Sequence, residues 1–160
     1  VALLASQDVF FIFFSRARFF HHYDYHDKWV DLPLMHQNGS TSGANSIVVK
    51  NSIRTGRKML VVGGDFTRDT SRVGNAAVSS DGGKTWIVPE EPPFGYRSSV
   101  TYVKGNKMIT CGTSGVDISE DGGHHWRNIS KTGYHVCQVA KDGHTVYLAG
   151  GNGRLARFTW

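Results

Sequence analysis

Hydrophobic and polar positions alternate in short runs along this chain, and turns containing glycine separate the runs, which is the pattern of β-strands. Three runs open with a glycine and cover residues 43–49, 95–101 and 133–139. A second set of apolar runs covers 59–63, 108–112 and 146–150, and third strands are predicted over 75–79, 116–119 and 154–159. Strands this short and closely spaced leave no room for a long helix, so we expect an all-β protein.

The N-terminal part of the chain is less regular. Strand-like pieces cover 9–14 and 16–22, and Trp29 could end an earlier repeat unit. The run over 9–14 is strongly apolar, but it is too short to span a bilayer and Arg16 and Arg18 follow it. We therefore predict a buried strand here and no transmembrane segment in this chain.

One eight-residue phrase occurs twice. Residues 79–86 spell Ser-Ser-Asp-Gly-Gly-Lys-Thr-Trp and residues 119–126 spell Ser-Glu-Asp-Gly-Gly-His-His-Trp, so Trp86 and Trp126 lie 40 positions apart. Asp-Gly-Gly favours a tight hairpin, because glycine tolerates positive φ and the carboxylate accepts hydrogen bonds from turn amides. The tryptophan ring can cover the join between neighbouring sheets. Repetition at this spacing is typical of a toroidal β-repeat, in which each unit is a small antiparallel sheet.

The phrase resembles the Asp-box of sialidases, sortilin-type receptors and related β-propellers, written Ser-x-Asp-x-Gly-x-Thr-Trp. The first copy matches every specified position, whereas the second carries His125 in place of threonine. We expect this exchange to weaken the tie across the second turn. The resemblance implies a structural role for Ser79, Asp81, Gly83, Thr85, Trp86, Ser119, Asp121, Gly123 and Trp126.

A wider resemblance covers the chain from residue 42 onward. The stretches 42–47, 61–66 and 95–100 look like the propeller proteins related to the photosystem II stability and assembly factors of plants and cyanobacteria. This similarity implies a seven-bladed type of propeller with four-stranded antiparallel blades. It further implies a non-enzymatic binding scaffold, usually extracytoplasmic (secreted or periplasmic). No GxGxxG motif follows a strand and the sequence has no flavin or haem motif, so we predict no cofactor.

Chain length limits the number of blades. At about 40 residues a blade, 160 residues give about three and a half to four blades, whereas closed propellers have about four to eight. We expect the C-terminal part of a longer, single propeller; a complete four-bladed protein is the alternative. The expected units are a drifted blade over 1–41, blades with an Asp-box over 42–94 and 95–132, and a terminal blade over 133–160.

The propeller model also locates a binding site. Loops joining the second and third strands lie on the face opposite the Asp-box turns, and this face should carry residues at the start of successive inner strands. The predicted ligand-binding residues at the channel mouth are Asn45, Arg97, His135, Asp65, Arg68 and Asp69. A protein or carbohydrate is the expected ligand. For Arg97 and His135, structural hydrogen bonds to neighbouring blades are the alternative.

A sialidase-like glycoside hydrolase is the alternative function. Arg97, Tyr96 and Asp65 could serve as carboxylate binder, nucleophile and proton donor, but the mechanism also needs a glutamate. Glutamate occurs only in a proline-rich connector, at Glu90 and Glu91, and inside the second Asp-box phrase. This alternative therefore requires further catalytic residues upstream of this chain.

Charge and composition narrow the remaining classes. The net charge is +5, and the basic residues are scattered rather than clustered, which argues against nucleic-acid binding. Cys111 and Cys137 fall on strands that should not be neighbours, so we expect free thiols. The histidines and aspartates over 21–27 resemble metal ligands, but we interpret this stretch as a polar hairpin and predict no metal site.

Overall fold

The structure is a computed structural model that describes residues 2–5, 8–11, 18–23, 26–34, 41–52 and 56–160. Its strands pair antiparallel throughout, and its one helical element in these residues is the 3-10 turn η1 (Phe66–Arg68). The prediction of an all-β protein is confirmed. No helix in the described ranges has the length and hydropathy needed to cross a bilayer.

The strands form small sheets that follow the order of the chain. The N-terminal hairpins are β1 (Ala2–Ala5) with β2 (Asp8–Phe11) and β3 (Arg18–Tyr23) with β4 (His26–Asp31). The central sheet contains β5 (Ser42–Ser52), β6 (Gly56–Asp65) and β7 (Ala76–Ser79). The four-stranded sheet contains β8 (Ser99–Tyr102), β9 (Met108–Gly112), β10 (Gly115–Ser119) and β11 (Arg127–Ser130), and the C-terminal sheet contains β12 (Val136–Val139), β13 (Thr145–Ala149) and β14 (Leu155–Thr159).

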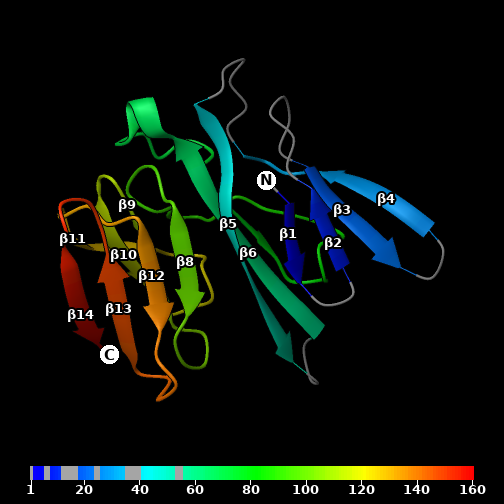
Figure 1. The fold of residues 1–160 in the computed structure, drawn as a ribbon. Helices are drawn as coiled ribbons and strands as arrows, with labels where there is room; N and C mark the ends of the chain where they lie inside the picture. The colour runs from blue at the N-terminus through cyan, green and yellow to red at the C-terminus, as the bar shows by residue number, and fades with distance from the viewer. Residues whose placement is uncertain (1, 6–7, 12–17, 24–25, 35–40, 53–55) are drawn as a thin grey trace.

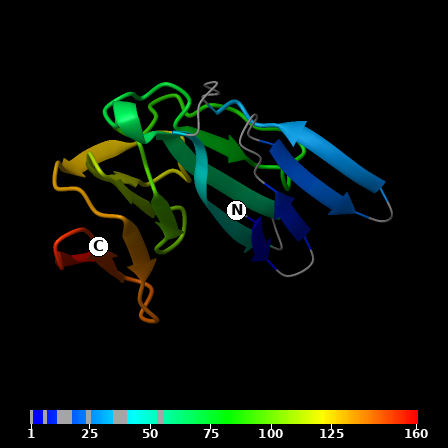
Figure 2. The same cartoon turned by 45° about the horizontal axis from the view of Figure 1, so that its top comes forward.

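These sheets stand in a row, as the progression of colour from blue to red shows in Figures 1 and 2. Their first strands β5, β8 and β12 are neighbours, joined by serine hydroxyls. Ser46 Oγ accepts a hydrogen bond from the Val100 amide at 3.3 Å, and Ser99 Oγ accepts one from the Cys137 amide at 3.1 Å. The part of the chain that the structure describes forms a row and not a closed ring.

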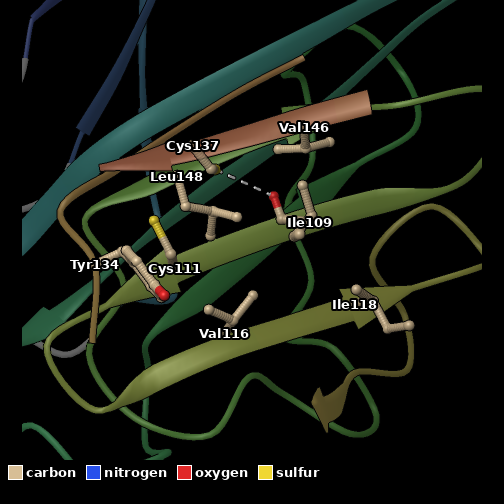
Figure 3. Close-up of a cluster of buried hydrophobic side chains, with 8 residues drawn as sticks. All are labelled: Ile109, Cys111, Val116, Ile118, Tyr134, Cys137, Val146 and Leu148. Atoms are coloured by element: carbon tan, nitrogen blue, oxygen red, sulfur yellow. Dashed lines mark hydrogen bonds between the residues drawn. The ribbon is translucent and has the colours of Figure 1, made fainter. Parts of the chain in front are cut away.

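Each sheet packs on the next through a repeated set of positions. We call the side turned to the following sheet the leading face and the other side the trailing face. The leading face of the central sheet carries Leu60, Val62, Ala76 and Val78, and these contact Val100, Met108 and Trp126 of the four-stranded sheet. One junction further, Ile109, Cys111, Val116 and Ile118 contact Tyr134, Cys137, Val146 and Leu148 of the C-terminal sheet (Figure 3).

The two leading faces have the same register. Leu60 pairs with Val78 and Val62 with Ala76, just as Ile109 pairs with Ile118 and Cys111 with Val116. All eight side chains are at most 5% exposed. Burial of apolar area at each junction is the main stabilising contribution, at about 25 cal/mol per Å². The two junctions therefore share one register of packing.

The N-terminal hairpins join the row through a third apolar cluster. Phe19, Leu32 and Leu34 pack against Met59, Val61, Ala77 and the half-buried Trp86 on the trailing face of the central sheet. The predicted hairpin over 21–27 is present in the backbone as β3 and β4, with His22 opposite Asp27.

Fourth strands vary between the units. The four-stranded sheet has β11, the central sheet has only the bridge between Val78 and Ile87, and the C-terminal sheet ends at β14. The strands of each sheet fall inside one of the four units expected from the sequence, with the N-terminal hairpins in the first.

Candidate functional site

The first repeated turn, over 79–86, is held by its own side chains. Ser79 Oγ donates to Asp81 at 2.8 Å and accepts from the Gly83 amide at 2.8 Å. Asp81 also accepts from the amide and the hydroxyl of Thr85, at 2.9 and 2.6 Å. The Trp86 indole donates to the Gly83 carbonyl at 3.0 Å. Every specified polar side chain of this turn is thus committed to closing it.

The second turn reproduces these bonds with a different partner. Asp121 receives the Ser119 hydroxyl at 2.8 Å and the His125 amide at 3.1 Å, and Trp126 donates to the Gly123 carbonyl at 2.9 Å. His125 Nδ1 lies 2.6 Å from Asp121 Oδ2, in the place that the threonine hydroxyl takes in the first turn. The imidazole thus bonds the aspartate where the first turn uses a hydroxyl, and the expectation that histidine weakens the tie stays a prediction.

Both aspartates are held in their charged form. Burial by itself would raise the pKa of Asp81, but the Thr85 hydroxyl and amide and the Ser79 hydroxyl outweigh it and hold the pKa at about 2. For Asp121, burial is likewise outweighed by the bonds from His125, and its pKa is also about 2. The hydrogen bond to Asp121 in turn raises the pKa of His125. These pKa shifts indicate that hydrogen bonds to the two carboxylates hold both turns in place.

Each of the two repeated turns also packs on the preceding sheet. A Cβ atom placed on Gly83 would collide with the Phe19 ring of the N-terminal hairpins, and one placed on Gly123 would lie 2.9 Å from Leu60 Cδ1 of the central sheet. The Trp126 side chain lies in the same junction and is 5% exposed. These contacts are those of structural residues.

Arg97 lies inside the molecule rather than at a surface. Gly63, Gly112 and Gly150 occupy equivalent places in their sheets. A Cβ atom added to each would lie within 3.2 Å of the Cα atom of Ala44, Arg97 and Tyr134 respectively. Arg97 therefore corresponds to Ala44 and Tyr134, and not to Asn45 and His135, although all three lie two residues after a glycine. Side chains alternate along a strand, so this one-residue offset moves Arg97 to the buried side.

The Arg97 guanidinium is fully buried and forms an ion pair with the buried Asp117. Its Nε lies 2.6 Å from Asp117 Oδ2, and its other nitrogens donate to the Phe94 and Tyr96 carbonyls and to Ser114 Oγ, at 2.6 to 2.8 Å. Burial lowers the pKa of Arg97, and Asp117 opposes that shift. Asp117 also accepts from the Phe94 amide and from Asn128. In this structure Arg97 offers no donor at the surface, which fits its structural alternative.

The other predicted site residues divide between surface and interior. Asn45, His135 and Arg68 are exposed and Asp69 is half-buried. Asp65 is 3% exposed and caps η1, accepting from the amide and hydroxyl of Thr67 at 2.9 and 2.7 Å. These bonds lower the pKa of Asp65, with the Thr67 hydroxyl the largest cause.

The loop after β6 is fixed to the four-stranded sheet and presents an aromatic side chain. The Asp69 carbonyl accepts the Tyr96 amide at 2.8 Å, and the Phe66 ring lies edge-on to the Tyr96 ring at 6.3 Å between centroids. Phe66 is 53% exposed. At the same end of the sheets, Arg154 lies over the Tyr134 ring and donates to the Gly133 carbonyl. We call this end of the sheets the loop end.

A hollow beside the second repeated turn (119–126) was not anticipated. It measures about 220 Å³ and is lined by Glu91, Ile118, Glu120, Asp121, His125, Trp126 and Arg127. A bridge between Glu91 and His125 brings the proline-rich connector against the second turn, and Glu90 lies 3.4 Å from the His125 ring. The sequence signal for this cluster was the histidine at the threonine position. Its glutamates are all exposed.

Side chains that could bind a metal are dispersed over the described part of the molecule. In the described residues no group of three or more His, Cys, Asp or Glu side chains is placed to hold an ion. The side chains over 21–27 lie outside that part. Cys111 and Cys137 are buried free thiols in one cluster (Figure 3).

Comparison with known proteins finds no family model that matches this chain and no curated protein that matches it.

Proposed function

We propose that this chain is a non-enzymatic binding scaffold of the β-propeller class. Two observations support the architecture: leading faces that pack on trailing faces in one register, and two turns that carry the hydrogen bonds of an Asp-box. We further propose that the protein is similar to the photosystem II assembly factor-like propellers and that it lies outside the cytoplasm.

The loop end of the sheets is the proposed binding surface, and a protein is the proposed ligand. The observation that carries this is the exposed Phe66 on a loop held in place by Asp65 and Tyr96, with exposed Arg68 beside it. Exposed aromatic and arginine side chains on a rigid support are typical of residues that dominate protein interfaces. The polar groups of the Asp-box turns, in contrast, are committed to each other.

Photo-crosslinking tests this assignment. A benzophenone amino acid replaces Phe66 at the loop end or, as the control, the exposed Lys84 at the Asp-box end. In an extract of the source cells we expect a discrete cross-linked protein from position 66 only. Excess unlabelled wild type should compete for it, and the Phe66→Ser/Arg68→Glu variant should not.

Equal cross-linking from both positions, or competition by the variant, would contradict the proposal. Loss of the product after enzymatic removal of glycans would instead assign the surface to a carbohydrate.

The glycoside hydrolase alternative gains no support from the geometry. The guanidinium of Arg97 is enclosed by protein acceptors, and burial raises the pKa of Tyr96, which disfavours the phenolate that a nucleophile needs. Assay with a fluorogenic sialoside checks this directly: we expect no turnover.

A further inference from the structure

The two cysteines of this chain meet across the junction between the four-stranded sheet and the C-terminal sheet. Cys111 lies on β9 and Cys137 on β12, and they are 0% and 3% exposed in one apolar cluster (Figure 3). The two strands belong to different sheets, but the packing of one sheet on the next makes them neighbours. A bond between the two sulfur atoms would therefore join two sheets.

Ser99 fixes the place of the Cys137 sulfur. Its Oγ accepts a hydrogen bond from the Cys137 amide at 3.1 Å and lies 3.5 Å from Cys137 Sγ. Ser99 is also the partner of Cys111 in the pairing of β8 with β9, and such partners have Cβ atoms about 5 Å apart on one face of the sheet.

A second contact places the same sulfur over β9. Cys137 Sγ lies 3.7 Å from the carbonyl oxygen of Ile109, two residues before Cys111. Contacts with Ser99 on one side and Ile109 on the other confine Cys137 Sγ to the surroundings of Cys111. The two thiols form a hydrogen bond with each other there.

We propose that Cys111 and Cys137 are an oxidisable pair, which a small disulfide compound converts into a disulfide that locks the C-terminal sheet onto the four-stranded sheet. In the structure both are free thiols, and apolar contacts and serine hydrogen bonds hold the junction. Oxidation would add a covalent link at the same place. The inference goes beyond the proposed binding function and depends neither on its ligand nor on its location.

The two thiols differ in acidity, and this difference orders the reaction. The hydrogen bond from Cys111 lowers the pKa of Cys137, with the help of the Ser99 hydroxyl and against the effect of burial. The bond between the thiols, together with burial, raises the pKa of Cys111. Because the thiolate is the nucleophile, Cys137 attacks first when a local opening of the junction admits the oxidant.

Oxidised glutathione is the oxidant used in the test, and its reaction with the pair balances in two steps. Cys137 Sγ bonds to one glutathione sulfur, the glutathione disulfide breaks, and the thiolate that leaves takes up the Cys137 proton. Cys111 Sγ then bonds to Cys137 Sγ and expels the second glutathione thiolate, which takes up the Cys111 proton. Two protein thiols lose two electrons, and one glutathione disulfide gains them and becomes two thiols.

The equilibrium with glutathione tests the proposal on the 160-residue chain. Folded protein is incubated in mixtures of oxidised and reduced glutathione, free thiols are blocked with iodoacetamide in denaturant, and the products are separated by intact mass. The chain has two cysteines, so an internal bridge can only join Cys111 to Cys137. We expect this bridge to predominate over mixed disulfides with glutathione, and trypsin should release it as peptide 108–127 linked to peptide 132–141.

Unfolded protein is the first control. The equilibrium constant for the internal bridge should be about a hundredfold larger in folded protein than in guanidinium chloride, if the native geometry favours the bond. By thermodynamic linkage, urea unfolding of the bridged protein should have an equilibrium constant lowered by the same factor.

A register variant is the matched control. Cys137→Ser/Gln138→Cys keeps two cysteines but moves the second thiol by one position, to the exposed side of β12. Circular dichroism checks that the variant folds. We expect it to form an internal bridge no more readily when folded than when unfolded.

Three results would overturn the proposal: no gain in bridge formation on folding of the wild type, a bridge in the folded register variant as favourable as in the wild type, or a disulfide between two chains as the main product. The comparison of folded with unfolded wild type needs no substitution, so it decides the matter even where the variant does not fold. Failure here leaves cross-linking at position 66 unaffected, so the two proposals fail separately.

Discussion

Replacing Arg97 with alanine should destabilise the protein strongly. The substitution removes the guanidinium that pairs with Asp117, whose side chain is 1% exposed. It also removes the donors that satisfy the Phe94 and Tyr96 carbonyls. A buried carboxylate would then keep only the Phe94 amide and the Asn128 amide group as donors.

The expected loss follows from the cost of an uncompensated buried charge. Removing one partner of a buried ion pair costs about 3–5 kcal/mol. Because Asp117 keeps two donors, we expect the lower end, about 3 kcal/mol in the free energy of unfolding. For a chain of this size, about 2–4 °C of melting temperature is lost per kcal/mol, so the midpoint should fall by about 6–12 °C.

Urea unfolding followed by tryptophan fluorescence measures the effect, since the chain contains four tryptophans. The control is Arg127→Ala, an exposed arginine on β11 that should change stability by less than about 0.5 kcal/mol. The Arg97→Met/Asp117→Leu variant should recover most of the loss, because an apolar pair leaves no buried charge. A cost below about 1 kcal/mol for Arg97→Ala would refute the structural role and return Arg97 to the ligand-binding residues.

Three further predictions concern the two repeated turns. Gly123→Ala should destabilise the protein more than Gly122→Ala in thermal unfolding: both glycines have positive φ, but only at Gly123 would the added Cβ press on the central sheet. The stabilisation from Asp81, whose pKa is about 2 against an ordinary 3.8, is present above pH 3.8 and lost as pH falls toward 2; Asp81→Asn should therefore flatten unfolding free energy against pH in that window. His125 has a raised pKa, so its contribution is complete below 6.5 and lost as pH rises through the folded value, a dependence that His125→Thr should abolish while keeping the turn.

The local elements of the fold could be predicted from the sequence because their signals are local. Asp-Gly-Gly located both hairpins, and apolar runs located the first three strands of the three later sheets, whereas β11 was not predicted. The phrase also predicted the role of Trp126 between sheets, although the packing partners Leu60 and Val78 lie far away in the chain.

The site was harder to predict because it depends on register and on distant contacts. Gly95 and Gly133 look equivalent in the sequence. In the structure, however, Gly112 lies against the Tyr96 carbonyl and Gly150 against the Gly133 carbonyl, so Tyr96 corresponds to Gly133. A shift of one residue reverses the face of a strand side chain, and it moved Arg97 from the expected surface to the core. The glutamates beside His125 meet through a bridge between a connector and a turn, which no local pattern encodes.

Contact between neighbouring sheets is the basis of the whole account, and nuclear Overhauser effects measure it directly. In protein with labelled methyl groups, we expect cross-peaks from the Trp126 indole to the methyl groups of Leu60 and Val78. We also expect cross-peaks from the Trp86 ring to the Phe19 ring. Observation of both sets would establish that consecutive sheets stack in one repeated register. Their absence in folded protein would contradict the stacking, and with it the propeller architecture proposed here.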